Sequence, residues 1–140
     1  MPAWRSAFGL DPQARACVFE EWRNSIKALA QRRNVCCKIG GFGLPFWGFG
    51  FDAREEPIGF EELAATSPVL TVVEAFGCNR CMMESNYPPD GRSAGFVPLW
   101  NALKHVLRSA SQEEKEALFQ GAAARTYRLS WSNNEGIERE

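Results

Sequence analysis

The sequence lacks a long apolar run, an excess of charge of either sign, and almost all histidine. No stretch approaches the roughly 18 consecutive apolar residues of a membrane span, and the opening MPAWRSAFGLDPQ holds no apolar run typical of a signal peptide. Sixteen basic residues against seventeen acidic ones leave a net charge of -1, so no basic field is available to hold a phosphate backbone. These absences predict a cytoplasmic protein that binds neither nucleic acid nor membrane.

Cysteine is present in an odd number, five, and Cys36 and Cys37 are adjacent. This usage favours a reducing compartment and small buried thiols over a disulfide framework. Cys78 and Cys81 form a C-x-x-C, but adjacent strand residues point to opposite faces, so Cys36 and Cys37 do not supply a second ligand pair. A zinc site is the less favoured interpretation.

Helical spacing of apolar residues recurs along much of the chain. Asp11 and Pro12 provide an N-cap and a first helical residue for a helix over 12–32. A second pattern covers 59–76, with a kink or restart at Ser67-Pro68. Further helices are predicted at 95–109, 112–120 and 122–129, the second of these opened by a capping box of Ser111 and Glu114.

Two short strands are predicted between the helices, at 35–39 and 80–85. The first ends at Gly40-Gly41, and the second runs into the breakers Pro88 and Pro89. Helices that alternate with short apolar strands indicate a parallel sheet and an α/β fold. Two parallel strands cannot cover themselves, so the sequence predicts part of a larger fold.

Three segments, RRNVCCKIGGFG, RCMMESNYPPD and ALFQGAAARTYRL, resemble the C-terminal portion of the amidohydrolase-related TIM-barrel hydrolases, a superfamily branch that includes lactonases. The likeness covers roughly residues 12–129. It implies a partial TIM (β/α)8 barrel, with about the last two βα units, a preceding helix and the C-terminal helices. Residues 1–129 would then be the C-terminal part of a barrel, and 130–140 a disordered tail.

The resemblance also bears on metal binding. The family's metal ligands are usually several histidines and an aspartate after the eighth strand, and the residue at that aspartate position is Asn86. The only histidine, His105, falls within a predicted helix, where a structural or solvated role is the expectation. No metal ligand is therefore predicted in this chain, although a divalent metal such as zinc remains compatible with a longer parent.

Alternation along the strands groups the candidate catalytic residues. If Asn86 points into the barrel mouth, Glu84 and Met82 share its side. Lys38 is placed inward on the neighbouring strand, because a lysine packed under helices is costly. The prediction is a Lys38–Glu84 ion pair with a buried carboxylate.

The predicted pair has a functional and a structural interpretation. In the functional one, Lys38 acts as electrophile toward a carboxylated substrate, with Asp90 or Glu84 as the base and Asn86 beside them at the mouth. In the structural one, the pair only fills the barrel.

An aromatic and glycine-rich loop follows the first strand. It is predicted to line a pocket or act as a lid, with Phe46, Trp47 and Phe49, joined by Tyr87, as substrate-binding residues. The alternative is that the loop aromatics, which include Phe42 and Phe51, cap the barrel end or contact a partner chain.

Taken together, these features predict the C-terminal fragment of a lactonase-like, metal-dependent-hydrolase-type enzyme. The full-length parent would hydrolyse a small-molecule ester, lactone or amide, and the fragment would be inactive alone because it lacks the histidine ligands. The alternative is a non-catalytic binding or dimerisation module that forms a homo-oligomer through its open sheet edges.

Overall fold

The computed structural model describes residues 12–44, 55–56, 58–66 and 68–130. Helices predominate, and the sheet is small. The helices and strands are α2 (Pro12–Ala30), β1 (Cys37–Ile39), α3 (Phe60–Thr66), α4 (Val69–Phe76), β2 (Cys81–Met83), α5 (Phe96–Val106), α6 (Gln112–Glu116) and α7 (Ala122–Tyr127). Short 3-10 helices occupy Cys78–Arg80 and Pro89–Arg92, and a π-helical turn, Ala117–Gly121, joins α6 to α7.

The two strands pair in parallel, as predicted. Cys37 lies opposite Cys81, Lys38 opposite Met82, and Ile39 opposite Met83. The backbone N–H of Glu84 donates to the Ile39 carbonyl at 3.0 Å, so pairing continues one residue beyond β2. Both strands are shorter than the predicted 35–39 and 80–85. At the amino end, the Val35 carbonyl accepts from the Arg80 guanidinium at 3.4 Å, and Arg80 itself belongs to a 3-10 helix.

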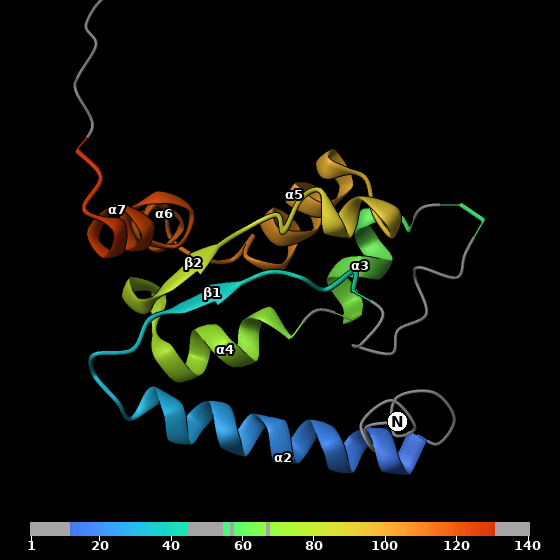
Figure 1. The fold of residues 1–140 in the computed structure, drawn as a ribbon, viewed down its shortest axis with the longest axis horizontal. Coiled ribbons are helices and arrows are strands. Elements are labelled where there is room, and N and C mark those ends of the chain that lie inside the picture. Colours follow the sequence, from blue (N-terminus) through green and yellow to red (C-terminus); the bar gives the residue numbers. More distant parts are fainter. Residues whose placement is uncertain (1–11, 45–54, 57, 67, 131–140) are drawn as a thin grey trace, which may run out of the picture.

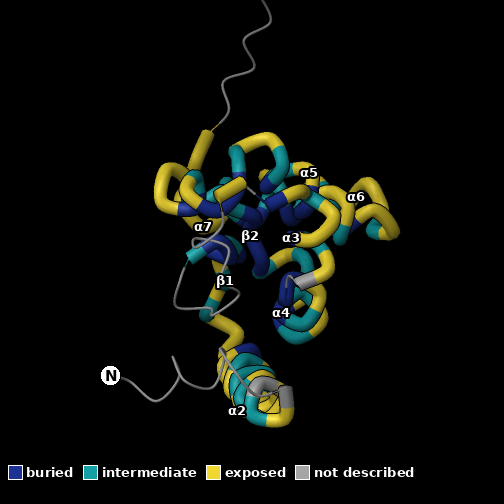
Figure 2. The backbone as a smooth tube through the Cα atoms, turned by 90° about the vertical axis from the view of Figure 1, so that its right-hand side faces the viewer, coloured by how far each residue is buried: buried dark blue, intermediate teal, exposed yellow. Residues whose placement is uncertain are grey.

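The helix α4 connects the strands and covers one side of the sheet. Figure 1 shows α4 and then α2 on one side of the strand pair, with α6 and α7 beside β2 on the other. Cys81 and Met83 belong to the main apolar cluster, together with Val69, Val72 and Phe76 of α4. In Figure 2 the buried backbone concentrates around β2 and the helices next to it. Alternation therefore sends Cys81 and Met83 into the helical core and leaves Lys38 and Glu84 for the other face.

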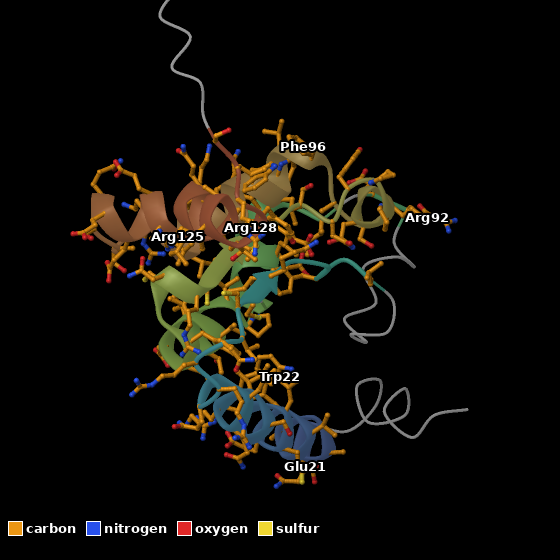
Figure 3. All side chains as sticks on the ribbon, turned by 60° about the vertical axis from the view of Figure 1, so that its left-hand side comes forward. Glu21, Trp22, Arg92, Phe96, Arg125 and Arg128 are labelled. Carbon is orange, nitrogen blue, oxygen red and sulfur yellow. The ribbon has the colours of Figure 1, made fainter. Side chains whose placement is uncertain are left out.

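Helix α2 packs against the core through a narrow apolar stripe. Trp22 and Ile26 contact the core and Ala30 is buried, whereas Phe19 and Leu29 are 37% and 47% exposed. Figure 3 shows Trp22 directed toward the rest of the chain and Glu21 directed away. The helix thus retains apolar surface that no described residue covers.

The predicted capping box at the start of α6 is confirmed. Ser111 Oγ accepts from the Glu114 N–H at 3.2 Å, and Glu114 Oε2 accepts from the Ser111 N–H at 2.7 Å. The predicted 112–120 and 122–129 helices are continuous through the π-helical turn. The predicted restart at Ser67-Pro68 is also present, as separate helices α3 and α4.

Alanine at Ser111 should lower the free energy of unfolding by about 1 kcal/mol, because the first turn of α6 loses its side-chain acceptor. Ser109→Ala is the matched control, since Ser109 is exposed and lies just outside the helix. Urea denaturation followed by circular dichroism measures both variants. Equal midpoints for the two would show that the capping box contributes nothing to stability.

Among the described residues, no helix combines the length and the apolar character that crossing a membrane requires. The predicted tail is almost entirely outside the described residues, which end at Ser130.

Candidate functional site

Four of the predicted site residues lie where β1 and β2 end. Lys38 is in β1, and Glu84, Asn86 and Asp90 follow β2. Carboxyl ends of parallel strands are the usual location of active sites in α/β folds, because loops from neighbouring strands converge there. The candidate site is therefore the loop region that follows these two strands.

Lys38 and Glu84 form the predicted ion pair, with 2.6 Å between Nζ and Oε2. Its surroundings differ from the prediction: the Lys38 side chain is 50% exposed and that of Glu84 28% exposed, so the carboxylate is not buried. Met82, which lies opposite Lys38 on the same face of the sheet, is 4% exposed, so the cover on this face reaches the middle of β2 but leaves Lys38 and Glu84 accessible. The hydrogen bond to Glu84, together with its charge, raises the pKa of Lys38 above its ordinary value, so the ammonium is retained at neutral pH.

Gly40 allows the ends of the two strands to approach each other. A Cβ at this position would lie 2.4 Å from Glu84 Cγ and 2.9 Å from the Glu84 carbonyl oxygen. The first of these atoms can move with its side chain, but the second belongs to the backbone. Glycine at position 40 therefore keeps Glu84 close to β1 and within reach of Lys38.

Asp90 connects the loop after β2 with the loop after β1. Its side chain is fully buried, at 0% exposure. Oδ1 accepts from Asn86 Nδ2 at 2.8 Å, and Oδ2 accepts from the Gly43 N–H at 3.3 Å. Ser93 Oγ donates to the Gly43 carbonyl at 2.6 Å and completes the connection. We refer to Asn86, Asp90, Gly43 and Ser93 as the loop latch.

The electrostatics of Asp90 are a balance of opposed effects. Burial raises the pKa of Asp90, the hydrogen bonds from Asn86 and Gly43 oppose that rise, and the charge of Glu84 adds to it. The net pKa is above its ordinary value. A carboxylate that is buried and hydrogen-bonded on both oxygens is poorly placed to accept a proton from water, so the structure does not favour Asp90 as the predicted base.

The predicted aromatic residues are only partly described. Phe46, Trp47 and Phe49, like Phe51, lie outside the described residues. Phe42 is buried in the main apolar cluster at 4% exposure, so it packs into the core. Tyr87 is 48% exposed, and its ring meets Phe96 edge-on with 5.4 Å between centroids.

Histidine and cysteine do not assemble into a metal site among the described residues. No group of three or more His, Cys, Asp or Glu side chains has a suitable arrangement there. His105 is exposed on α5 and packs against the Phe60 ring, with 5.7 Å between centroids. The described donor set therefore does not fit a catalytic divalent ion.

All five cysteines are free thiols. Cys81 is buried as predicted, and burial raises its pKa to about 12, whereas Cys17 and Cys36 are exposed. Burial also raises the pKa of the half-buried Cys37 and Cys78 thiols. Burial therefore makes the C-x-x-C thiols less reactive as nucleophiles than free thiols.

A cavity of about 320 Å³ opens among α3, α4 and α5 rather than at the strand ends. It contains none of the predicted site residues. Its lining consists of Glu61, Ala64, Ala65, Leu70, His105, Val106 and Arg108. Because it lacks the Lys38–Glu84 pair and the loop latch, we place the candidate chemistry at the strand ends.

Two members of the loop latch were not predicted from the sequence. Gly43 and Ser93 are 50 residues apart and meet only through the tertiary structure. The glycines of GGFG were a usable signal, since a run of glycine directly after a strand often marks close backbone approach. No comparable signal marked Ser93.

Comparison with known proteins identifies the family. The amidohydrolase family model matches residues 8–129. The uncharacterized protein y4mH of Sinorhizobium fredii is 37% identical over 111 residues, which are 79% of this chain and 34% of that protein. The chain belongs to the amidohydrolase family.

Solved structures agree on the fold. Crystal structures of an amidohydrolase from Burkholderia multivorans, one with bound zinc and one with bound HEPES, superpose with a TM-score of 0.69 at 24% identity. The superposed regions include 89% and 90% of this chain but only 41% and 42% of the Burkholderia chain. This chain thus spans less than half the length of the proteins that it matches.

Proposed function

We propose that residues 1–129 form about the last two βα units of an amidohydrolase-type (β/α)8 barrel, and that the complete barrel hydrolyses a small ester, lactone or amide. The observation that carries this proposal is the exposed Lys38–Glu84 pair at the carboxyl ends of adjacent parallel strands. A complete barrel of this kind has eight strands and about 250 residues, with its active site at that end. The family match and the shared fold support the proposal.

The chemistry follows from what each side chain can do. Water attacks the substrate carbonyl carbon while Glu84, the more accessible of the two candidate bases, takes a proton from that water. The Lys38 ammonium stabilises the negative charge that develops on the carbonyl oxygen, or binds a carboxylate elsewhere on the substrate. The bond to the leaving oxygen or nitrogen then breaks as the proton passes to the leaving group, and a carboxylic acid results.

A ring-shaped, carboxylated lactone is the substrate class that best suits this arrangement. Lys38 complements a carboxylate, and we propose that Phe46, Trp47, Phe49 and Tyr87 provide apolar contact with the ring. No step is assigned to a metal. The described residues hold no group of three or more His, Cys, Asp or Glu side chains arranged for a divalent ion such as zinc, so in a longer protein such a site would need ligands from further residues.

The 140-residue chain alone is expected to be inactive, because two strands supply only part of a barrel mouth. The test compares this chain with a longer polypeptide that includes the preceding barrel strands, against a panel of small lactones, esters and amides, with and without Zn²⁺. Turnover by the longer polypeptide alone supports the proposal. Metal-dependent turnover by the 140-residue chain would contradict it.

A second candidate function is a binding or dimerisation module. It is favoured by apolar surface that the described residues leave open: Phe19 and Leu29 on α2, and Phe96 and Val97 at the start of α5, are 37% to 65% exposed. Each strand also has one edge without a partner strand among the described residues. Sedimentation equilibrium distinguishes the candidates, since a well-folded oligomer supports the module and a folded monomer counts against it.

A further inference from the structure

Asp90 takes no direct part in the proposed hydrolysis. It is a buried carboxylate at the edge of the candidate site, with both oxygens engaged by the two loops. Burying a charge is costly unless it is hydrogen-bonded, so a residue of this kind is expected to fix its partners in place. The partners that Asp90 fixes are the Asn86 carboxamide and the Gly43 backbone.

We propose that Asp90 is a positioning residue that orients the Asn86 carboxamide, so that Asn86 Oδ1 faces solvent at the strand ends and accepts a hydrogen bond from the substrate or from the attacking water. This inference rests on the proposed hydrolytic function. It narrows the substrate class to molecules that present a hydroxyl or N–H donor, or an ordered water, to Asn86.

The orientation follows from hydrogen-bond chemistry. An ionised carboxylate only accepts hydrogen bonds, so the carboxamide atom that faces Asp90 Oδ1 at 2.8 Å must be the donor Nδ2. The amide is planar, so its oxygen is directed away from Asp90. Asp90 therefore determines which end of the Asn86 amide is presented.

The oxygen of Asn86 remains available for a ligand. No described residue donates to Asn86 Oδ1, and it is not among the buried polar atoms that lack a partner. Asn86 as a whole is half-buried, which leaves part of its surface open to solvent. The Asn86 backbone is held in the left-handed region at φ 48°, which asparagine tolerates better than most residues.

The same geometry makes the orientation depend on pH. A protonated Asp90 would donate its O–H to Asn86 Oδ1, and the amide would turn its Nδ2 outward. The charged groups near Asp90 are Glu84, after β2, and the Lys38 that pairs with Glu84 from β1. Because burial, with a smaller contribution from the charge of Glu84, keeps the pKa of Asp90 above its ordinary value, the reversal should occur at a higher pH than for an exposed aspartate.

Nuclear magnetic resonance on the 140-residue chain tests the proposal without requiring activity. We expect the Gly43 amide proton and the Asn86 side-chain amide protons to titrate together with the Asp90 carboxyl carbon. When Asp90 is ionised, hydrogen exchange at Asn86 Nδ2 should be about tenfold slower than at the exposed side chain of Asn101, as a bond to a charged acceptor predicts. Asp90→Asn should abolish the shared titration and make exchange at Asn86 faster, because a neutral amide oxygen is a weaker acceptor than a carboxylate.

The outcomes separate this inference from the function on which it rests. Titration of Asp90 without any response at Asn86, or equal exchange at Asn86 and Asn101, would overturn the positioning role even in an active enzyme. Coupled titration in a protein whose longer form hydrolyses nothing would sustain the positioning role and count against the hydrolase. If Asp90→Asn does not fold, the titration of the unaltered chain still decides the question.

Discussion

Glutamine at position 84 is expected to lower the kcat for lactone hydrolysis by the longer polypeptide by about 10²–10⁴-fold, the usual contribution of a general base. Glu84→Gln keeps the size of the side chain and still offers an oxygen to Lys38 at the strand ends. It removes the basic carboxylate that takes the proton from water. A loss confined to kcat, with KM nearly unchanged, would identify a group that acts in the transition state.

Glu113→Gln is the matched control for this change. Glu113 is an exposed residue in the first turn of α6, outside the candidate site, so its loss should leave kcat unchanged. Thermal melting of both variants checks that folding is preserved. If Glu84→Gln retains most of the activity, the base lies elsewhere, and the Lys38–Glu84 pair has the structural role that the sequence also allowed.

Alanine at Gly40 is expected to destabilise the chain by about 1–3 kcal/mol, the usual range for overpacking. The added methyl would lie 2.9 Å from the Glu84 carbonyl oxygen, which cannot move without separating the strand ends. The Glu84 N–H would then weaken its bond to Ile39, now 3.0 Å, and the Lys38–Glu84 pair would open. Urea denaturation measures the first effect. A fall in the Lys38 pKa toward its ordinary value, followed by NMR, measures the second.

Gly59→Ala provides the comparison for Gly40→Ala. A Cβ at Gly59 would meet no atom within 4 Å, so its effect should stay within about 1 kcal/mol, the range of ordinary Gly-to-Ala changes. Equal urea midpoints for the two variants would mean that the ends of β1 and β2 move apart at little cost to accommodate the added methyl group. The close approach at Gly40 would then have no part in positioning Glu84.

Sequence reasoning succeeded where the signal is local. The helix from Pro12, the restart after Pro68 and the capping box of Ser111 and Glu114 depend on residues only a few positions apart. Period-two alternation likewise predicted that Lys38 and Glu84 would meet, because it needs only two parallel strands in one register. The family resemblance, drawn from three short segments, is also confirmed.

Sequence reasoning was less accurate where long-range contacts decide. One example is the end of α2, which depends on the Arg80 guanidinium. This group donates to the Ala30, Arg32 and Phe76 carbonyls at 3.0 to 3.1 Å. The bonds to Ala30 and Arg32 satisfy the end of α2, which stops at Ala30 instead of the predicted residue 32, and they hold that end near β2. Nothing local in RCMMES indicates such partners about 50 residues away.

The sequence by itself determined the order of helices and strands, the pairing of Lys38 with Glu84 and the family, since each rests on local spacing or on short motifs. Only the tertiary structure decided that Glu84 meets solvent while Asp90 is buried and orients Asn86. The physical reason is that burial and hydrogen-bond partners depend on which segments pack together. Gly43 and Ser93 surround Asp90 only because the loops after β1 and β2 converge.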